Sequence, residues 1–338
     1  MRLKIYEFDM KLRYPFSISR HTYYSQQNII VELQHKGFMG YGEATVNPYY
    51  NITIENLRNS FETIGKRLND YVFDNPDQLY EDFSDFLKIN SFALCALNNA
   101  SWDLYAKICG TGISDFIELS KQNPPQTSYT IGIDDKDKMV KKMTDLPWPI
   151  YKIKLGTSND LSLMKHLQKH TKSKLRVDAN CAWTAEKTIA ISQELKQLGV
   201  EFIEQPLSAG NPDQEYCLDK CSLPLIADES CCTEYDVELC HHKFHGINIK
   251  LLKCGGITPA LRMIQKAREL GLKIMIGCMS ETSVGISASA QLLPYVDYAD
   301  LDGPLLLGED VANGLSYTYG KLTVSNRNGL GIVFIGKN

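Results

Sequence analysis

The sequence predicts an α/β fold, a (β/α)8 barrel joined to an N-terminal α+β capping domain. The first observation is a series of eight short apolar or β-branched runs, at 129–133, 151–155, 175–179, 201–205, 224–228, 246–250, 273–277 and 298–302. The second is their spacing, since consecutive centres lie 22 to 27 residues apart, which leaves room for a strand, a turn and a helix. The third is helical periodicity between the runs, at 159–170, 184–198, 234–242 and 258–270. A doubly wound sheet rarely repeats its unit so evenly eight times, so we expect a closed barrel.

The N-terminal third has a different pattern. Strands are expected at 3–12 and 28–34, with a glycine-punctuated turn and return strand at 37–42, and helices at 53–68, 78–87 and 92–108. We therefore divide the chain into a capping domain at 1–122, a barrel at 123–305 that carries the metal and catalytic residues, and a tail at 306–338 that packs back on the cap. The dipeptide Pro124-Pro125 marks the linker.

The composition narrows the class of protein. With 43% hydrophobic and 22% charged residues, the 338-residue chain is typical of globular proteins. Its net charge of −4 predicts no nucleic-acid partner, and no apolar run reaches the roughly 18 residues of a membrane span. The N-terminus has no apolar signal segment, and ten scattered cysteines without a C-x-x-C pair predict reduced thiols and a cytoplasmic location. The sequence is compatible with a homo-oligomer.

Charged side chains recur at the carboxyl ends of the predicted strands. They are Lys152, Lys154, Asp178, Glu204, Asp228, Lys250, Asp300 and Asp302. The carboxyl ends of barrel strands form the rim at which active sites lie. Ionisable groups inside β-runs are costly unless they are paired or bound to a metal. A set of unrelated solvated strand ends does not account for all of these residues together, so we expect one active site at this rim.

Five ordered motifs carry a family resemblance. They are Lys152-Ile-Lys154, Asp178-Ala-Asn180, Glu204-Gln-Pro206, Asp228-Glu-Ser230 and Asn248-Ile-Lys250. At this spacing the chain resembles the enolase superfamily, muconate-lactonizing subgroup, over almost its whole length. Within that subgroup it is most similar to the dipeptide epimerases, because of Asp300-Leu-Asp302-Gly-Pro304, Gly277-Cys-Met-Ser-Glu281 and Arg20.

The resemblance implies a metal site and two catalytic bases. Asp178, Glu204 and Asp228 would hold one Mg²⁺ per active site, with Mn²⁺ as the alternative, because hard oxygen donors without His or Cys suit these ions. Lys154 and Lys250 would be the bases, and their strands lie four apart in a ring of eight, so the two amines would face each other.

The remaining site residues would tune the bases or bind the substrate. Lys152 would lower the pKa of Lys154 and contact the substrate carboxylate, since residues two apart on a strand share a face. The resemblance assigns Asp300 and Asp302 to the substrate ammonium, Arg20 to a glutamate side chain, Thr130 and Met279 to further contacts, and Tyr49 and Tyr50 to a second lid. Glu229 follows a metal ligand directly, so strand alternation predicts that its side chain points away from the site.

Together these roles imply an isomerase, a metal-dependent epimerase that inverts the α-carbon of the C-terminal residue of L-Ala-Glu-like dipeptides through an enediolate. L-Ala-D/L-Glu epimerase activity, in murein-peptide metabolism, is the type that the resemblance implies. The alternatives are an N-acylamino acid racemase or an o-succinylbenzoate synthase or cycloisomerase on the same scaffold, and a non-catalytic barrel that binds a small peptide. Asp300 and Asp302 would repel a dianionic substrate, and a binding barrel has no need of both lysines. The sequence leaves the second residue of the dipeptide open.

Overall fold

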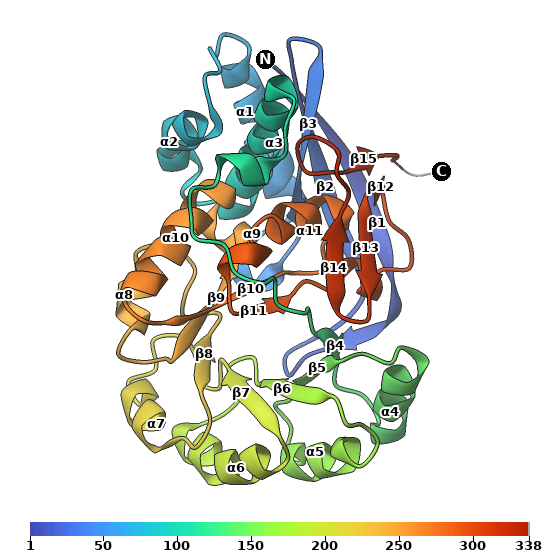
Figure 1. Cartoon of the computed structure of the whole chain (residues 1–338), viewed down its shortest axis with the longest axis vertical. Coiled ribbons are helices and arrows are strands. Elements are labelled where there is room, and N and C mark those ends of the chain that lie inside the picture. The colour runs from blue at the N-terminus through green and yellow to red at the C-terminus, as the bar shows by residue number, and fades with distance from the viewer. Residues whose placement is uncertain (337–338) are drawn as a thin grey trace.

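The computed structural model describes residues 1–336 of the chain and contains a closed barrel of eight parallel strands in chain order. The strands are β4 (Tyr129–Ile131), β5 (Ile150–Lys154), β6 (Lys174–Asp178), β7 (Val200–Glu204), β8 (Leu225–Ala227), β9 (Gly246–Lys250), β10 (Lys273–Gly277) and β11 (Tyr298–Asp300). A parallel bridge between Thr127 and Ala299 joins the first strand to the last, with a 3.1 Å hydrogen bond from the Ser128 amide to the Ala299 carbonyl. The predicted barrel, the lower body in Figure 1, is confirmed.

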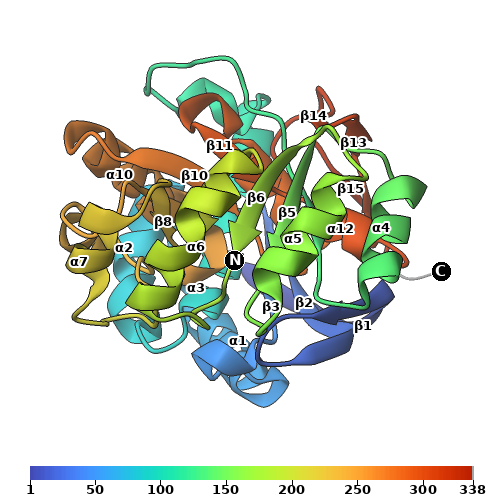
Figure 2. The same ribbon diagram turned by 90° about the horizontal axis from the view of Figure 1, so that it is seen from below.

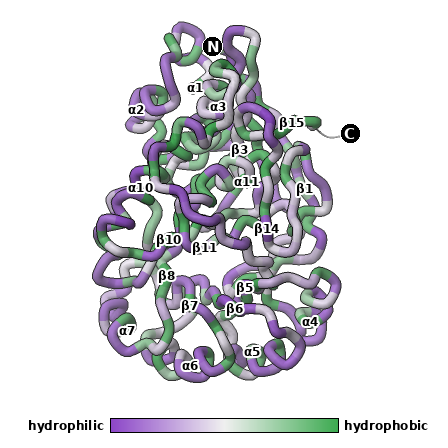
Figure 3. Tube along the Cα trace, in the orientation of Figure 1, coloured by the Kyte–Doolittle hydropathy of each residue, from purple (hydrophilic) through white to green (hydrophobic). Residues whose placement is uncertain are grey.

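Helices cover the outside of the barrel, as the view from below shows (Figure 2). They are α4 (Lys136–Asp145), α5 (Asp160–Gln168), α6 (Ala185–Gln197), α7 (Gln214–Lys220), α8 (Asp236–Cys240), α9 (Leu251–Cys254), α10 (Ile257–Glu269), α11 (Ser283–Ala290) and α12 (Gly303–Leu306). Hydrophilic residues mark the outer faces of α5, α6 and α7 (Figure 3). Among residues 1–336, no helix has the length and apolarity that crossing a membrane requires.

The N-terminal part forms a three-stranded antiparallel sheet with three helices, at the top of Figure 1. It consists of β1 (Arg2–Ser17), β2 (Thr22–His35), β3 (Phe38–Thr45), α1 (Ile54–Leu68), α2 (Pro76–Leu87) and α3 (Ser91–Cys109). The predicted turn and return strand are confirmed, with Gly37 at the turn and Gly40 and Gly42 inside β3. A Cβ at these positions would lie 2.1 Å from the Ala100 carbonyl oxygen and 2.0 Å from that of Ala96, so glycine lets α3 pack directly on the sheet.

The segment after the barrel returns to this sheet. It contains β12 (Ala312–Asn313), β13 (Leu315–Thr318), β14 (Lys321–Val324) and β15 (Val333–Phe334). The Leu330 amide donates a 2.7 Å hydrogen bond to the Asp103 carboxylate of α3, and the Phe334 ring lies 5.1 Å from the ring of Tyr6. Of the predicted tail at 306–338, residues 337–338 lie outside the described residues, and the division into three parts stays a prediction.

A buried glutamate of the cap joins it to the barrel. The Glu43 carboxylate of β3 accepts hydrogen bonds from the Thr282 amide at 2.9 Å, the Thr282 hydroxyl at 2.6 Å and the Gly285 amide at 2.8 Å. These donors form the N-terminus of α11, where backbone N–H groups and the helix dipole favour an anion. Glu281, 3% exposed, lies beside this junction and accepts a 2.9 Å hydrogen bond from the Met279 amide.

Glu281 should make stability depend on pH. Burial, and then the charge of Glu43, raises the pKa of Glu281 to about 8 from the ordinary 4.5. Between these pH values the unfolded chain has lost the proton that the folded chain still binds, so stability falls as pH rises. The wild type should therefore lose on the order of 2 kcal/mol of unfolding free energy between pH 5.5 and pH 8, and Glu281→Gln should not show this loss. Urea unfolding at the two pH values measures the difference. Glu238→Gln on exposed α8 is the control, and an identical pH slope in both variants would contradict the assignment.

Candidate active site

A cavity of about 400 Å³ opens at the carboxyl ends of the barrel strands. The barrel side chains that line it are Thr130, Lys152, Lys154, Asn180, Asp228, Glu229, Lys250, Cys278, Met279, Ser280, Asp300, Asp302 and Leu306. Two segments of the cap cover it. One is the end of the β1–β2 hairpin with Ile18, Arg20 and Tyr23, and the other is the loop after β3 with Tyr49 and Tyr50. The structure thus brings most of the predicted site residues to one cavity.

Three carboxylates lie together beside this cavity, and one of them, Asp228, lines it. Asp178, Glu204 and Asp228 end or directly follow β6, β7 and β8, and each offers an oxygen within 4.8 Å of the others. All three are buried, and in residues 1–336 they form the one group of at least three His, Cys, Asp or Glu residues with this geometry. Three oxygen donors without nitrogen or sulfur are the donor set that Mg²⁺ and Mn²⁺ prefer, so the trio fits a divalent cation of this kind.

Lys152 lies at the centre of the charged cluster. Its ammonium is 2.7 Å from Asp300, 2.8 Å from Glu204 and 3.2 Å from Asp178. Burial alone would lower the pKa of Lys152, but the three carboxylates outweigh burial and raise it well above its ordinary value. Lys152 is therefore a fixed positive charge.

The two lysines that the sequence analysis assigned as bases each touch a carboxylate of the trio. Lys154 Nζ lies 2.6 Å from Asp178, and Lys250 Nζ lies 2.8 Å from Asp228. They extend from β5 and β9, which are separated by three strands in the ring, so the amines reach the cavity from opposite sides. Burial opposes the charge of Lys250, but Asp228 outweighs burial and raises the pKa of Lys250.

Three buried side chains that the sequence analysis did not assign hold the carboxylates in place. Lys253 contacts Asp228 at 2.6 Å, and Asn248 donates to Glu204 at 2.9 Å. Gln205 accepts from the amides of Asp228 at 2.9 Å and Ser230 at 3.0 Å, so it ties the loop after β7 to the loop after β8. The sequence offers one clue to these residues, because Gln205 and Asn248 lie within the five motifs and Lys253 follows the last of them.

The backbone directly after two of the carboxylates is left-handed. Asn180, Cys181 and Gln205 have φ angles of 44°, 66° and 34°. Such conformations are uncommon for residues other than glycine and concentrate at functional sites. In this structure they turn the chain sharply at the rim, and the Asn180 carbonyl faces the cap.

An acidic pair, Asp300 and Asp302, lies at and just after the end of the eighth barrel strand. Asp300 accepts from the Ser128 hydroxyl at 2.5 Å, and Asp302 accepts from the Thr130 amide at 2.6 Å. Burial raises the pKa of Asp300, but Lys152 outweighs burial and holds it below the ordinary value. Asp302 forms no ion pair with any residue of 1–336, and burial followed by the charge of Asp300 raises the pKa of Asp302 to about 7.

The cap contributes Arg20 and two tyrosines. The Arg20 guanidinium donates to the Asn180 carbonyl at 2.8 Å and to Glu229 at 3.1 Å, and it stacks on Tyr49 at 4.3 Å from the ring centre. The expectation that Glu229 points away from the site is wrong. β8 ends at Ala227, so strand alternation no longer applies at Glu229, and its side chain lines the cavity.

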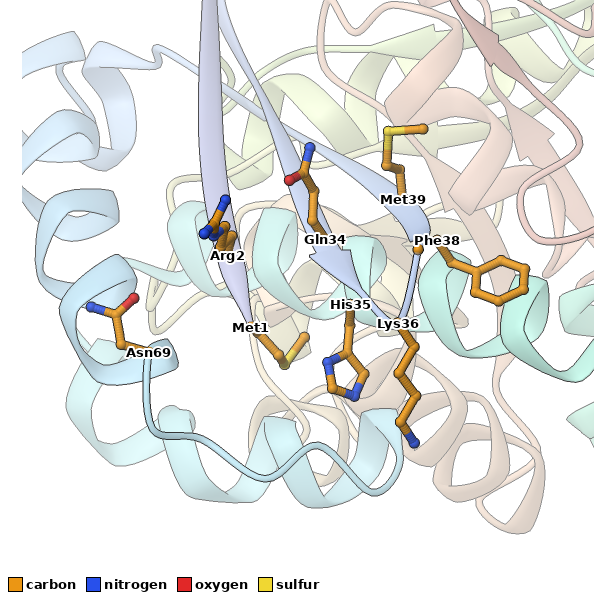
Figure 4. Close-up of a pocket in the computed structure, with 9 residues that line it drawn as sticks. Met1, Arg2, Gln34, His35, Lys36, Phe38, Met39 and Asn69 are labelled. Carbon is orange, nitrogen blue, oxygen red and sulfur yellow. The ribbon is translucent and has the colours of Figure 1, made fainter.

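A second pocket lies at the far end of the cap (Figure 4). It is formed by the β2–β3 turn and the N-terminus, with Arg2, His35, Lys36 and Phe38 among its lining residues, and none of the predicted site residues contributes to it. It is therefore separate from the charged cavity.

Fold and site together define an α/β-barrel enzyme in which carboxylates on three consecutive strands adjoin lysines on opposite sides of one cavity. Comparison with known families agrees. Residues 1–117 match the mandelate racemase/muconate lactonizing enzyme N-terminal domain, and residues 137–336 match the enolase C-terminal domain-like family. The chain belongs to the muconate-lactonizing subgroup of the enolase superfamily and, within it, to the dipeptide epimerase family, which confirms the resemblance.

Individual relatives are similar over their full length. The L-Ala-D/L-amino acid epimerase of Flavobacterium johnsoniae is 50% identical over 99% of this chain and 100% of its own length. The substrate-liganded L-Ala-D/L-Glu epimerase of Bacillus subtilis superposes with a TM-score of 0.94, at 25% identity, over 100% of this chain and 99% of that one. The dipeptide epimerase of Cytophaga hutchinsonii, in complex with Mg and D-Ala-L-Val, superposes with a TM-score of 0.93 at 27% identity. The match covers 98% of this chain and 95% of that one.

The bridging role of Gln205 predicts a large effect of its removal. Gln205→Ala leaves the Asp228 and Ser230 amides without their acceptor in a buried site, so we expect a loss of roughly 2–4 kcal/mol in the free energy of unfolding. Gln214→Ala is the matched control, because that buried glutamine makes a single 3.1 Å hydrogen bond to the Lys243 carbonyl. Urea unfolding measures both variants, and equal losses would contradict the bridging role.

Proposed function

We propose that this protein is a metal-dependent dipeptide epimerase that inverts the α-carbon of the C-terminal residue of a dipeptide by two-lysine 1,1-proton transfer. The observation that carries the proposal is that Lys154 and Lys250 enter one cavity from opposite sides, each beside a carboxylate of the same trio. Inversion of a carbon acid needs one group to remove the proton from one face and another to deliver a proton to the other face. L-Ala-Glu-like dipeptides are the proposed substrates.

Asp178, Glu204 and Asp228 would hold the metal ion, with Mg²⁺ as the proposed ion and Mn²⁺ as the alternative. When bound, a divalent ion supplies positive charge that stabilises the negative oxygens formed when a proton leaves the carbon next to a carboxylate. Lys253, Asn248 and Gln205 would keep these ligands in their orientation, as supporting residues around metal sites do.

The lysines act in opposite protonation states. A lysine paired with a carboxylate keeps its proton, so the residue that serves as the base has to leave its ion pair with Asp178 or Asp228. The other lysine keeps its proton and delivers it to the opposite face. Lys152, a permanent cation beside both the trio and Asp300, shares the Asp178 carboxylate with Lys154 and would contact the substrate carboxylate.

Asp300 and Asp302 would receive the ammonium of the N-terminal residue, with Thr130 and Met279 as further contacts at the cavity wall. An N-acylamino acid or a succinyl diacid has no ammonium and would leave two buried carboxylates facing an uncharged or anionic group. This disfavours the alternative reactions of the same scaffold. We further propose a cytoplasmic location, which ten free cysteines support, and a role in murein-peptide metabolism. The homo-oligomer stays a prediction.

Removing either proposed base should abolish the reaction. We expect Lys154→Ala and Lys250→Ala each to lower kcat for L-Ala-L-Glu epimerisation by about 10³-fold or more, because general-base catalysis is worth 10²–10⁴-fold and no other group takes its place. Chiral chromatography of the product in the presence of Mg²⁺ measures the rate.

Lys174→Ala is the control for this experiment. Lys174 lies at the opposite end of its barrel strand, pairs with Glu201 at 3.0 Å and is 66% exposed, so the variant should retain wild-type kcat. Full activity in either cavity variant would exclude that lysine from proton transfer.

The proposed ammonium site predicts a pH dependence. Asp302 is neutral below its pKa of about 7 and cannot attract an ammonium, so kcat/KM, which reports the free enzyme, should rise with pH until about 7 and then level off. Asp302→Asn should lower kcat/KM and remove this rise, measured with L-Ala-L-Glu from about pH 5.5 to 8.5. The same rise in the variant would assign the ionisation to another group.

A further inference from the structure

Arg20, the cationic side chain of the cap at the cavity, already has a counter-ion, which is Glu229. Arg20 and Glu229 are 3.1 Å apart, and the Glu229 side chain is 4% exposed. One carboxylate oxygen of Glu229 accepts the hydrogen bond from Arg20. The other oxygen is buried and has no hydrogen-bond partner among the described residues. Glu229 is therefore a buried carboxylate whose counter-charge is Arg20, a side chain that is itself only partly buried.

Arg20 lies across the barrel mouth from the acidic pair of the eighth strand. Its contacts, the Asn180 carbonyl and Glu229, follow the third and the fifth barrel strands, whereas Asp300 and Asp302 lie on and after the eighth. If the ammonium of a dipeptide binds at the eighth strand, as proposed above, the side chain of its C-terminal residue extends toward Arg20.

The cap lines the cavity with apolar as well as polar side chains. Ile18, Val46 and Tyr49 are among the apolar ones, and Gln26 and Asn47 are among the polar ones. An uncharged substrate side chain can pack on this surface and leave the ion pair intact. An acidic side chain has to share Arg20 with Glu229, so it gains less from this guanidinium than it would from an arginine without a counter-ion.

We propose that Glu229 is a specificity-determining residue that neutralises Arg20, so that the enzyme accepts dipeptides with uncharged as well as acidic C-terminal residues. This inference rests on the proposed function and names the feature that sets its substrate range. Glu229 acts on selectivity through charge, and it is distinct from the groups that move the proton.

The test compares kcat/KM for L-Ala-L-Glu, L-Ala-L-Leu and L-Ala-L-Lys in three variants. Glu229→Gln leaves Arg20 without its counter-ion, so the ratio of the Glu to the Leu dipeptide should rise at least about tenfold. Arg20→Gln leaves Glu229 uncompensated, so the ratio of the Lys to the Leu dipeptide should rise by a similar factor of about ten. The double variant removes both charges and should return both ratios to within about threefold of the wild-type values.

A merely structural role would lower all three activities by the same factor and leave the ratios unchanged, even if Glu229→Gln also disturbs its neighbour Asp228. Ratios that stay within about twofold of wild type in both single variants, or a ratio of the Glu to the Leu dipeptide that rises in both of them, overturn the inference. Such a result leaves the proposed function intact as long as the wild-type protein epimerises any of the three dipeptides. A wild type that epimerises none of them overturns the proposed function itself.

Discussion

Compensation of buried charge is the constraint on which this structure depends. Four carboxylates, those of Asp178, Glu204, Asp228 and Asp300, lie at 0–4% exposure at the barrel mouth. Four ammonium groups, those of Lys152, Lys154, Lys250 and Lys253, contact them at 2.6–3.2 Å. A charge buried without a partner destabilises a protein by several kcal/mol, so removing any member of this cluster lowers the stability of the fold. The register of six of the eight barrel strands, β5 to β9 and β11, brings the partners together.

Much of this arrangement could be predicted because parallel strands obey simple rules. Even spacing indicated the barrel, and the carboxyl ends of its strands indicated where the acidic and basic side chains meet. α11 escaped prediction because it consists of small residues buried on every side, so it has no amphipathic period. α4 was not predicted because too few of its residues are apolar to give a helical period. The close packing of α3 on Gly40 and Gly42 was not predicted, because a glycine in a strand does not reveal which element packs on it.

Within the site, prediction failed where the regular backbone ends. Strand alternation gave the wrong direction for Glu229, which follows the end of β8. The role of Gln205 depends on a left-handed turn that no periodicity reveals. Arg20 was found through family resemblance, but its partner could not be predicted, because the contact joins segments 209 residues apart. The proposed proton-transfer lysines lie on barrel strands, whereas Arg20, the proposed selectivity residue, lies on a hairpin of the cap. The Glu43 carboxylate of the cap accepts a hydrogen bond from the N-terminus of α11.

The central claim is that two lysines act on opposite faces of one carbon, and the isotope pattern of the wild-type reaction tests it most directly. With Mg²⁺ and L-Ala-L-Glu in D₂O, early product analysed by mass spectrometry and NMR should contain deuterium at the glutamyl α-carbon, while the recovered substrate keeps mainly protium. Product that retains the original α-proton, or substrate and product that gain deuterium at equal rates, would mean that a single group serves both faces and would contradict the account.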